Sequence, residues 1–158
     1  KLSSSSGSTN QISGPYYNFT SPEPLGIVAV IAPEKLSLLG FVHAVAPVVV
    51  AGNTCVAIAS ERYPLAAMTL AEVIATSDVP AGVINILTGL KNELLPWVAS
   101  HMEIDGIDIS GADAKTEIEL RISGSENLKR IHRFENHPDL QRILAFMESK
   151  TVWHPIGI

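Results

Sequence analysis

The feature that most constrains the fold is a short run, residues 26–32, in which every position is apolar or glycine. A strand that is buried on both faces has such a continuous apolar run, and strands of this kind belong to parallel sheets. Pro33 ends the run, and a long apolar segment follows at 36–51 until a Gly-Asn pair stops it. A second β-rich run comes directly after, at 54–58. Strand, helix and strand within about 33 residues is the span of a βαβ unit.

The same alternation continues toward the end of the chain. Strands are expected at 27–32, 54–58, 83–87, 104–109 and 127–134, and helices at 36–51, 64–76, 92–100, 113–122 and 140–147. This order predicts an α/β fold with a doubly wound, mostly parallel five-stranded Rossmann-like sheet, helices on both faces and right-handed crossovers. Pro47 lies inside the first helix, where we expect a kink or an early break.

A chain of 158 residues predicts one domain. Residues 1–20 are rich in Ser, Gly, Thr and Asn, so we expect a flexible, linker-like segment there. The α/β domain is expected at 21–137, followed by a C-terminal helix and apolar tail at 138–158. The chain starts at Lys1 rather than at a methionine, which suggests a piece of a longer polypeptide.

Composition excludes several classes of function. Hydrophobic residues make up 46% of the chain and charged residues only 17%, as in a module that packs against other protein, although two-sided burial of a parallel sheet also raises the apolar share. A net charge of −5 gives no basic footprint for nucleic acid, and no apolar run reaches the ~20 residues of a membrane span. The single cysteine weakly favours a reducing compartment, so we expect a cytoplasmic protein. No histidines stand at metal-ligand spacing, so no metal site is expected.

Ligands of doubly wound sheets bind beyond the carboxyl ends of the strands. Four segments occupy those places here: Pro33-Glu34-Lys35, Ala59-Ser60-Glu61, Thr88-Gly89 and Ser110-Gly111-Ala112. None contains the Gly-x-Gly-x-x-Gly turn that wraps a pyrophosphate, so the usual dinucleotide fingerprint is absent.

Several runs of this sequence nevertheless resemble the coenzyme domain of the aldehyde dehydrogenase superfamily, in order and spacing from Glu23 to about Arg130. The runs are Pro24-Leu25-Gly26-Ile27-Val28, Ala51-Gly52-Asn53-Thr54, Ser60-Glu61, Val79-Pro80-Ala81-Gly82-Val83-Ile84-Asn85-Ile86-Leu87-Thr88-Gly89 and Asn127-Leu128-Lys129-Arg130. The resemblance implies a fold that binds NAD(P) without a Gly-rich fingerprint. The cofactor-binding positions that it implies, in vestigial form, are Pro33, Ser60, Glu61, Gly89 and Gly111.

The departures from the family pattern fall on the residues that should touch coenzyme or substrate. Lys35 stands where the family has the Asn that supports the oxyanion, and Ile58 replaces the Lys that holds the adenosine ribose. A carboxylate, Asp113, lies beside the helix N-terminus that would face the pyrophosphate, where it would occupy or repel the anion site. Phe134 stands at the place of the catalytic Glu. The single thiol, Cys55, falls inside a strand and is expected to be a buried structural residue.

No catalytic residue is therefore expected in this chain. The architecture is most similar to the shorter, non-catalytic C-terminal module of family-16 aldehyde dehydrogenases, which implies a partner: a catalytic dehydrogenase unit of the same or another chain, or another copy. Two alternatives stay open. The chain is a vestigial domain that still takes NAD or NADP weakly, or it is the coenzyme-domain piece of an active aldehyde dehydrogenase. No cofactor is expected under the first reading.

Overall fold

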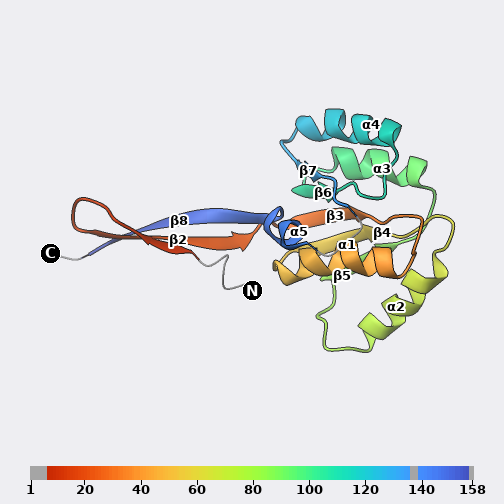
Figure 1. Cartoon of the computed structure of the whole chain (residues 1–158), viewed down its shortest axis with the longest axis horizontal. Helices are drawn as coiled ribbons and strands as arrows, with labels where there is room; N and C mark the ends of the chain where they lie inside the picture. The colour runs from red at the N-terminus through yellow and green to blue at the C-terminus, as the bar shows by residue number, and fades with distance from the viewer. Residues whose placement is uncertain (1–6, 136–138, 157–158) are drawn as a thin grey trace.

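The computed structural model describes residues 7–135 and 139–156. The chain forms an α/β body from which a long, narrow β-ribbon projects to one side (Figure 1). None of the helices in the described residues is long and apolar enough to cross a membrane.

The body is built on a parallel sheet in the order β5-β4-β3-β6-β7. Its strands are β3 (Ile27–Ile31), β4 (Thr54–Ile58), β5 (Ile84–Leu87), β6 (Gly106–Asp108) and β7 (Arg130–His132). The helices between them are α1 (Leu39–Val50), α2 (Leu65–Ala75), α3 (Lys91–Ser100) and α4 (Ala114–Ser125). This arrangement confirms the expected five-stranded, doubly wound fold.

The apolar run of β3 packs into two cores, one on each face of the sheet. Val28 and Val30 are fully buried among side chains of α1 and α2, and Ala29 and Ile31 are fully buried among those of α3 and α4. Helices accordingly cover both faces (Figure 1). Because successive residues of a strand point to opposite faces, a central strand between two helical layers must be apolar at every position.

Helix α1 does not end early at Pro47 and continues to Val50. Proline has no N–H to bond the carbonyl four residues earlier, here that of His43. The His43 oxygen instead accepts a bond of 3.1 Å from Nη1 of Arg142, which lies in the short helix α5 (Leu140–Leu144). A distant guanidinium thus replaces the missing helical hydrogen bond.

The ribbon was not expected from the sequence. It contains β1 (Ser8–Asn10), β2 (Tyr16–Pro24) and β8 (Met147–Pro155), which are antiparallel in the order β1-β2-β8. Residues 8–10 and 16–20 are therefore strands rather than the linker expected at 1–20, and 147–155 is a strand rather than a tail. The expected boundary at 137/138 lies outside the described residues. The linker prediction failed because it rested on local composition, whereas β2 is held by a partner more than 120 residues away, from Tyr16↔Pro155 to Pro24↔Met147.

Asn53 joins the ribbon to the body. The residue is 2% exposed, and its side-chain oxygen accepts a bond of 2.8 Å from the Gly26 N–H. Its amide donates to the carbonyl oxygens of Val48, at 3.2 Å, and Phe146, at 2.9 Å. The Phe146 oxygen also accepts from the N–H of Leu25 at 3.2 Å. One buried amide therefore fixes the start of β3, the end of α1 and the residue before β8.

Candidate functional site

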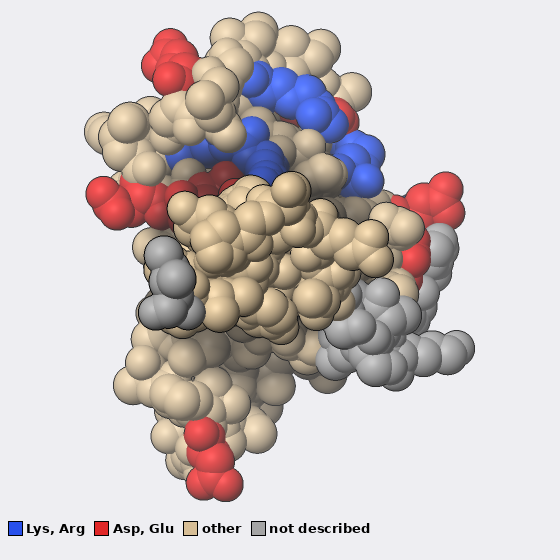
Figure 2. Space-filling view, turned by 90° about the vertical axis from the view of Figure 1, so that its left-hand side faces the viewer, with Lys and Arg blue, Asp and Glu red and all other residues tan. Residues whose placement is uncertain are grey.

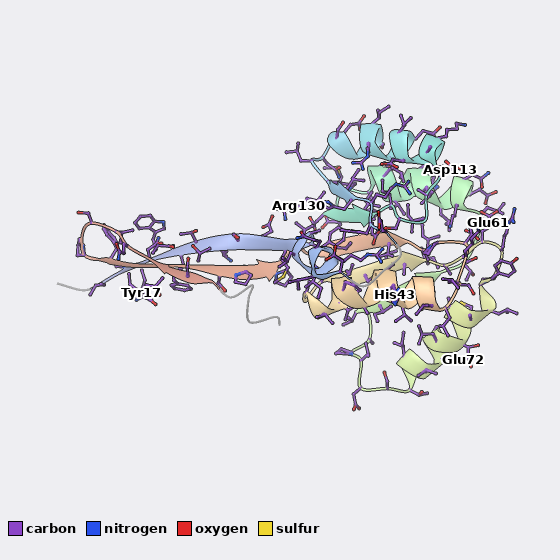
Figure 3. All side chains as sticks on the ribbon, viewed as in Figure 1. Tyr17, His43, Glu61, Glu72, Asp113 and Arg130 are labelled. Atoms are coloured by element: carbon purple, nitrogen blue, oxygen red, sulfur yellow. The ribbon has the colours of Figure 1, made fainter. Side chains whose placement is uncertain are left out.

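The carboxyl ends of the parallel strands border a hollow of about 390 Å³. It is lined by Glu34, Glu61, Leu90, Lys91, Asn92, Leu95, Gly111, Ala112, Asp113 and Thr116. Glu61 and Asp113 lie at the end of the body farthest from the ribbon (Figure 3). This is the crevice in which sheets of this kind bind their ligands.

Glu34 is the centre of the polar contacts at this edge. Its carboxylate accepts from Ser60 Oγ at 2.7 Å and from the backbone N–H groups of Glu61 at 3.2 Å and Arg62 at 3.1 Å, and it forms an ion pair with Lys91. Partial burial opposes ionisation of Glu34, but these bonds, led by that from Lys91, outweigh it and lower its pKa from 4.5 to about 2. The carboxylate is charged and fully engaged at neutral pH.

Lys91 fills the space between the strand ends. Its side chain is 13% exposed, and Nζ donates to the carbonyl oxygens of Ala32 at 2.8 Å and Gly111 at 3.4 Å. The backbone N–H of the same residue donates to Glu61 Oε2 at 2.9 Å. The first turn of α3 is thereby tied to the ends of three neighbouring strands, to β3 and β6 by the side chain of Lys91 and to β4 by its main chain.

The structure brings three of the five expected cofactor-binding residues to this crevice. Ser60 is buried and bonds Glu34, Glu61 accepts from α3, and Gly111 lines the hollow. A Cβ at Gly111 would collide with the Ala32 carbonyl, so only glycine fits there. Gly89 is exposed just before α3 and does not line the hollow, and neither does Pro33, which is half-buried beside α1.

Asp113 occupies the N-terminus of α4. Its Oδ1 accepts from the Thr116 N–H at 2.7 Å, and this backbone bond is the main cause of its lowered pKa. The amide positions that attract an anion at a helix start therefore already face a carboxylate. With Glu34 also acidic and Lys91 engaged internally, the crevice residues do not fit a dinucleotide in the manner that the resemblance implies.

Sequence reasoning missed a second buried cluster at the ends of β6 and β7. Asp108 and Arg142 form an ion pair of 3.1 Å, with side chains 1% and 3% exposed. Ser110 Oγ donates to Asp108 and accepts from Arg142 at 3.0 Å and from the Phe134 N–H at 3.0 Å. The guanidinium carbon lies 5.0 Å from the Phe134 ring centroid. The available signal was Asp108 itself, a charge inside an otherwise apolar strand, which must have a partner.

Burial raises the pKa of Asp108, against the opposing effects of Ser110 and Arg142. Phe134 stands at the position where the resemblance places a catalytic Glu. Its ring packs against Arg142 of the buried ion pair. Lys35, at the place of the oxyanion Asn, is exposed. Neither residue offers the group that the family pattern has there.

Cys55 lies within β4 and is fully buried. Burial, followed by the nearby charge of Asp108, raises its pKa to about 12. A thiol in this state is not a nucleophile. Among the described residues, no group of three or more His, Cys, Asp or Glu side chains could hold a metal ion.

Comparison with known proteins assigns these features to a family. The aldehyde dehydrogenase family model matches residues 2–133. The chain is 36% identical over 125 residues to retinal dehydrogenase 2 of Homo sapiens, covering 79% of this chain and 24% of the relative. It is 33% identical to aldehyde dehydrogenase 1A1 of Equus caballus, with 79% and 25% covered. The chain therefore spans about a quarter of the length of these relatives.

Solved structures give the same result. PnpE from Pseudomonas sp. WBC-3 superposes with a TM-score of 0.72 at 26% identity, over 83% of this chain and 27% of that one. Aldehyde dehydrogenase C from Pseudomonas syringae, a C291A mutant solved in complex with NAD⁺ and octanal, superposes with a TM-score of 0.68 at 27% identity, over 78% and 25%. The chain belongs to the aldehyde dehydrogenase family, and its body has the family's Rossmann-like fold.

Proposed function

We propose that this chain is a non-catalytic aldehyde-dehydrogenase-like module that works by association: it packs against a catalytic aldehyde dehydrogenase unit, of its own or another chain, or against another copy. The observation that carries the proposal is the Glu34–Lys91 ion pair across the coenzyme crevice. The pair satisfies, from within the chain, polar groups that a bound coenzyme would otherwise contact.

The chemistry of the family supports the same conclusion. Aldehyde oxidation through a thiohemiacetal needs a nucleophilic thiol, an oxyanion donor and a base for the hydrolytic step. Here the only thiol is buried at Cys55, and Phe134 and Lys35 stand at the other two places. This argues against the alternative of a working coenzyme-domain piece of an active enzyme.

The ribbon supports an association role. A three-stranded ribbon that projects from its domain leaves much of its side-chain surface uncovered. Tyr16, Tyr17 and Trp153 are 46%, 47% and 60% exposed there, and Tyr and Trp are enriched in the cores of protein interfaces. Seen from the ribbon side, the middle of the surface carries uncharged residues, while Lys and Arg gather in the upper part (Figure 2). The proposal includes two further points. The chain corresponds to the C-terminal module of family-16 aldehyde dehydrogenases, and it is located in the cytoplasm.

Calorimetric titration of the chain with NAD⁺ and NADP⁺ tests the coenzyme part. We expect no binding heat up to millimolar ligand. The matched variant is Glu34→Ala/Lys91→Ala, which removes the ion pair from the crevice but leaves Glu61 and Gly111 in place. A dissociation constant below about 1 mM for the unaltered chain would instead favour the alternative of a vestigial NAD(P)-binding domain, which rests on those two retained positions.

The association part is tested by size-exclusion chromatography with light scattering at micromolar concentration, with and without a catalytic aldehyde dehydrogenase unit. A chain that stays monomeric and shows no affinity for that unit would contradict it. The complete reading frame adds an independent check, because an upstream unit with intact Cys and Glu would support the module interpretation.

A further inference from the structure

Strand β5 forms one edge of the parallel sheet. The Cys55 N–H bonds the carbonyl oxygen of Val83, so the odd-numbered residues of this segment direct their backbone groups toward β4. The even-numbered residues, Ile84 and Ile86, direct theirs outward, where the described residues place no strand. β5 contains no proline and no charged residue of the kind that protects an edge from further pairing. Its two outward residues therefore offer N–H and C=O groups to an added strand.

An apolar hollow lies beside each face of this edge. On the face of α2, a hollow of about 330 Å³ is bordered by Ile74, Ile84 and Ile86. On the face of α3, a hollow of about 310 Å³ is bordered by Leu87 and Trp97, and Trp97 is 74% exposed. Because successive residues of a strand point to opposite faces, a strand added beside β5 would direct its side chains alternately into the two hollows.

The surroundings of this edge are acidic. Within residues 63–104, four exposed carboxylates take part in none of the ion pairs of the described residues: Glu72, Asp78, Glu93 and Glu103. Lys91 is the only Lys or Arg of that stretch, and it is paired internally with Glu34. Glu103 borders the hollow beside α3, and Glu72 lies on α2 (Figure 3). Two copies joined at β5 would set these carboxylates against one another, whereas a basic partner complements them.

We propose that the β5 edge binds an extended segment of another protein as an additional strand, with alternate apolar side chains in the two hollows and Lys or Arg residues at its ends. The inference rests on the association role proposed above and names the surface and the chemistry of the partner segment. The main chain of that segment bonds the outward groups of Ile84 and Ile86. Its side chains cover Leu87 and Trp97, and its basic ends face the four carboxylates. Main-chain bonds give such strand addition its affinity, and pockets for alternate side chains give it specificity.

The binding test uses the full chain and a defined probe, fluorescein-labelled Lys-Arg-Val-Leu-Val-Leu-Lys-Arg. Its four apolar residues match the length of β5. We expect saturable binding by fluorescence anisotropy, weakened at least tenfold when Glu and Asp replace the Lys and Arg residues. No saturable binding at submillimolar concentrations of the chain would overturn the proposal.

Two methylated probes separate strand addition from unspecific adhesion. One carries N-methyl groups on both valines and the other on both leucines, so each lacks alternate N–H groups. An added strand directs only every second N–H toward β5. We expect one methylated probe to bind at least tenfold more weakly than the parent and the other to bind within about threefold of it. Equal binding of the two forms would refute strand addition.

Variants of the chain locate the site. Trp97→Ser should weaken binding of the parent probe at least tenfold, whereas Trp153→Ser, which removes an exposed Trp of the ribbon, is the matched control and should leave it unchanged. Glu72→Lys/Glu103→Lys should weaken binding at least fivefold, and Glu126→Lys, at the end of α4, should change it less than twofold. Equal losses from W97S and W153S would place the probe elsewhere and contradict the assignment.

Hydrogen exchange gives a readout at the edge itself. With probe bound, the amide hydrogens of Ile84 and Ile86 should exchange at least tenfold more slowly, while those of Asn85 and Leu87, which face β4, should not change. Unchanged exchange at Ile84 and Ile86 would refute the pairing.

Light scattering with a catalytic unit reports on the association role separately. A chain that binds that unit but not the probe refutes the β5 site alone. A chain that binds the probe but neither the unit nor another copy supports the β5 site and contradicts the association role as stated.

Discussion

Arg142 donates to the carbonyl oxygen of His43, the acceptor that Pro47 leaves without a helical partner. The same guanidinium bonds Asp108 and Ser110, so a single side chain connects α5, α1 and β6. Pro47, which would be expected to break α1, instead frees the His43 carbonyl, and that carbonyl helps to hold the C-terminal part of the chain against the sheet.

Replacement of Arg142 with Leu should be strongly destabilising, because it leaves the Asp108 carboxylate buried without its partner. We expect a loss of about 3–5 kcal/mol in the free energy of unfolding, measured by urea denaturation. The double variant Asp108→Ala/Arg142→Leu should recover much of this loss. Arg121→Leu, which breaks the exposed pair with Glu117, is the control and should cost less than about 1 kcal/mol. Equal effects of R142L and R121L would show that the buried pair is not what holds α5.

Glu34 should give an acid-dependent contribution to stability. Its pKa in the folded chain, about 2, lies below the ordinary value of 4.5, so its ionised form is stabilised by folding. The contribution is present above pH 4.5 and is lost as the pH falls toward 2. Thermal melts of Glu34→Gln should therefore lie below those of the unaltered chain at pH 6, and the gap should narrow in acid. Glu72→Gln, on the exposed side of α2, is the control (Figure 3). A gap that does not depend on pH would contradict the assignment.

Asn53→Ala should loosen the joint between ribbon and body. The substitution leaves the Gly26 N–H without its acceptor, whereas the Val48 and Phe146 carbonyls lose one bond each and keep those from the backbone N–H groups of residue 53 and Leu25. One unsatisfied N–H costs about 1–3 kcal/mol, so a loss of about that size in the free energy of unfolding is expected. Asn92→Ala, at an exposed position of α3, should change stability by less than about 0.5 kcal/mol. Hydrogen exchange should accelerate in β2 and β8 before it does in β4.

Cys55 should not react with a thiol reagent in the folded chain. Its pKa of about 12 and its complete burial leave almost no accessible thiolate at pH 8. Titration with a disulfide reagent should show one reactive thiol per chain after denaturation and none before. Rapid native labelling would show that β4 opens, and would reopen the question of a reactive cysteine.

The body was largely predictable because its elements are specified locally. The apolar run of β3 and the β-rich segment 54–58 predict buried parallel strands. The observed extent of β4 is 54–58, as predicted. The ribbon was not predictable in this way. Its strands contain Ser, Thr, Pro and charged residues, and the two long ones, β2 and β8, pair with each other from opposite ends of the sequence.

The crevice was predictable in place but not in detail. Ser60, Glu61 and Gly111 lie where the family resemblance puts them, yet the residue that fills the space is Lys91, from the start of α3. A lysine at a helix start gives no indication, in sequence, of the direction in which its side chain points. Glu34 lies in the segment predicted at the end of the first strand, but its inward position depends on the N–H groups of residues 61 and 62, which the sequence does not reveal.

Because the Leu25 N–H bonds the Phe146 carbonyl, the two points at which the chain enters and leaves the body lie side by side. The body is thus an insertion between the two strands of a single β-hairpin, closed at its base by that bond and by Asn53. Such a unit is attached to the ribbon at a single place, where the chain both enters and leaves the body. Residues 25–146 could be inserted into the hairpin loop of an unrelated protein, or circularly permuted, without breaking the parallel sheet.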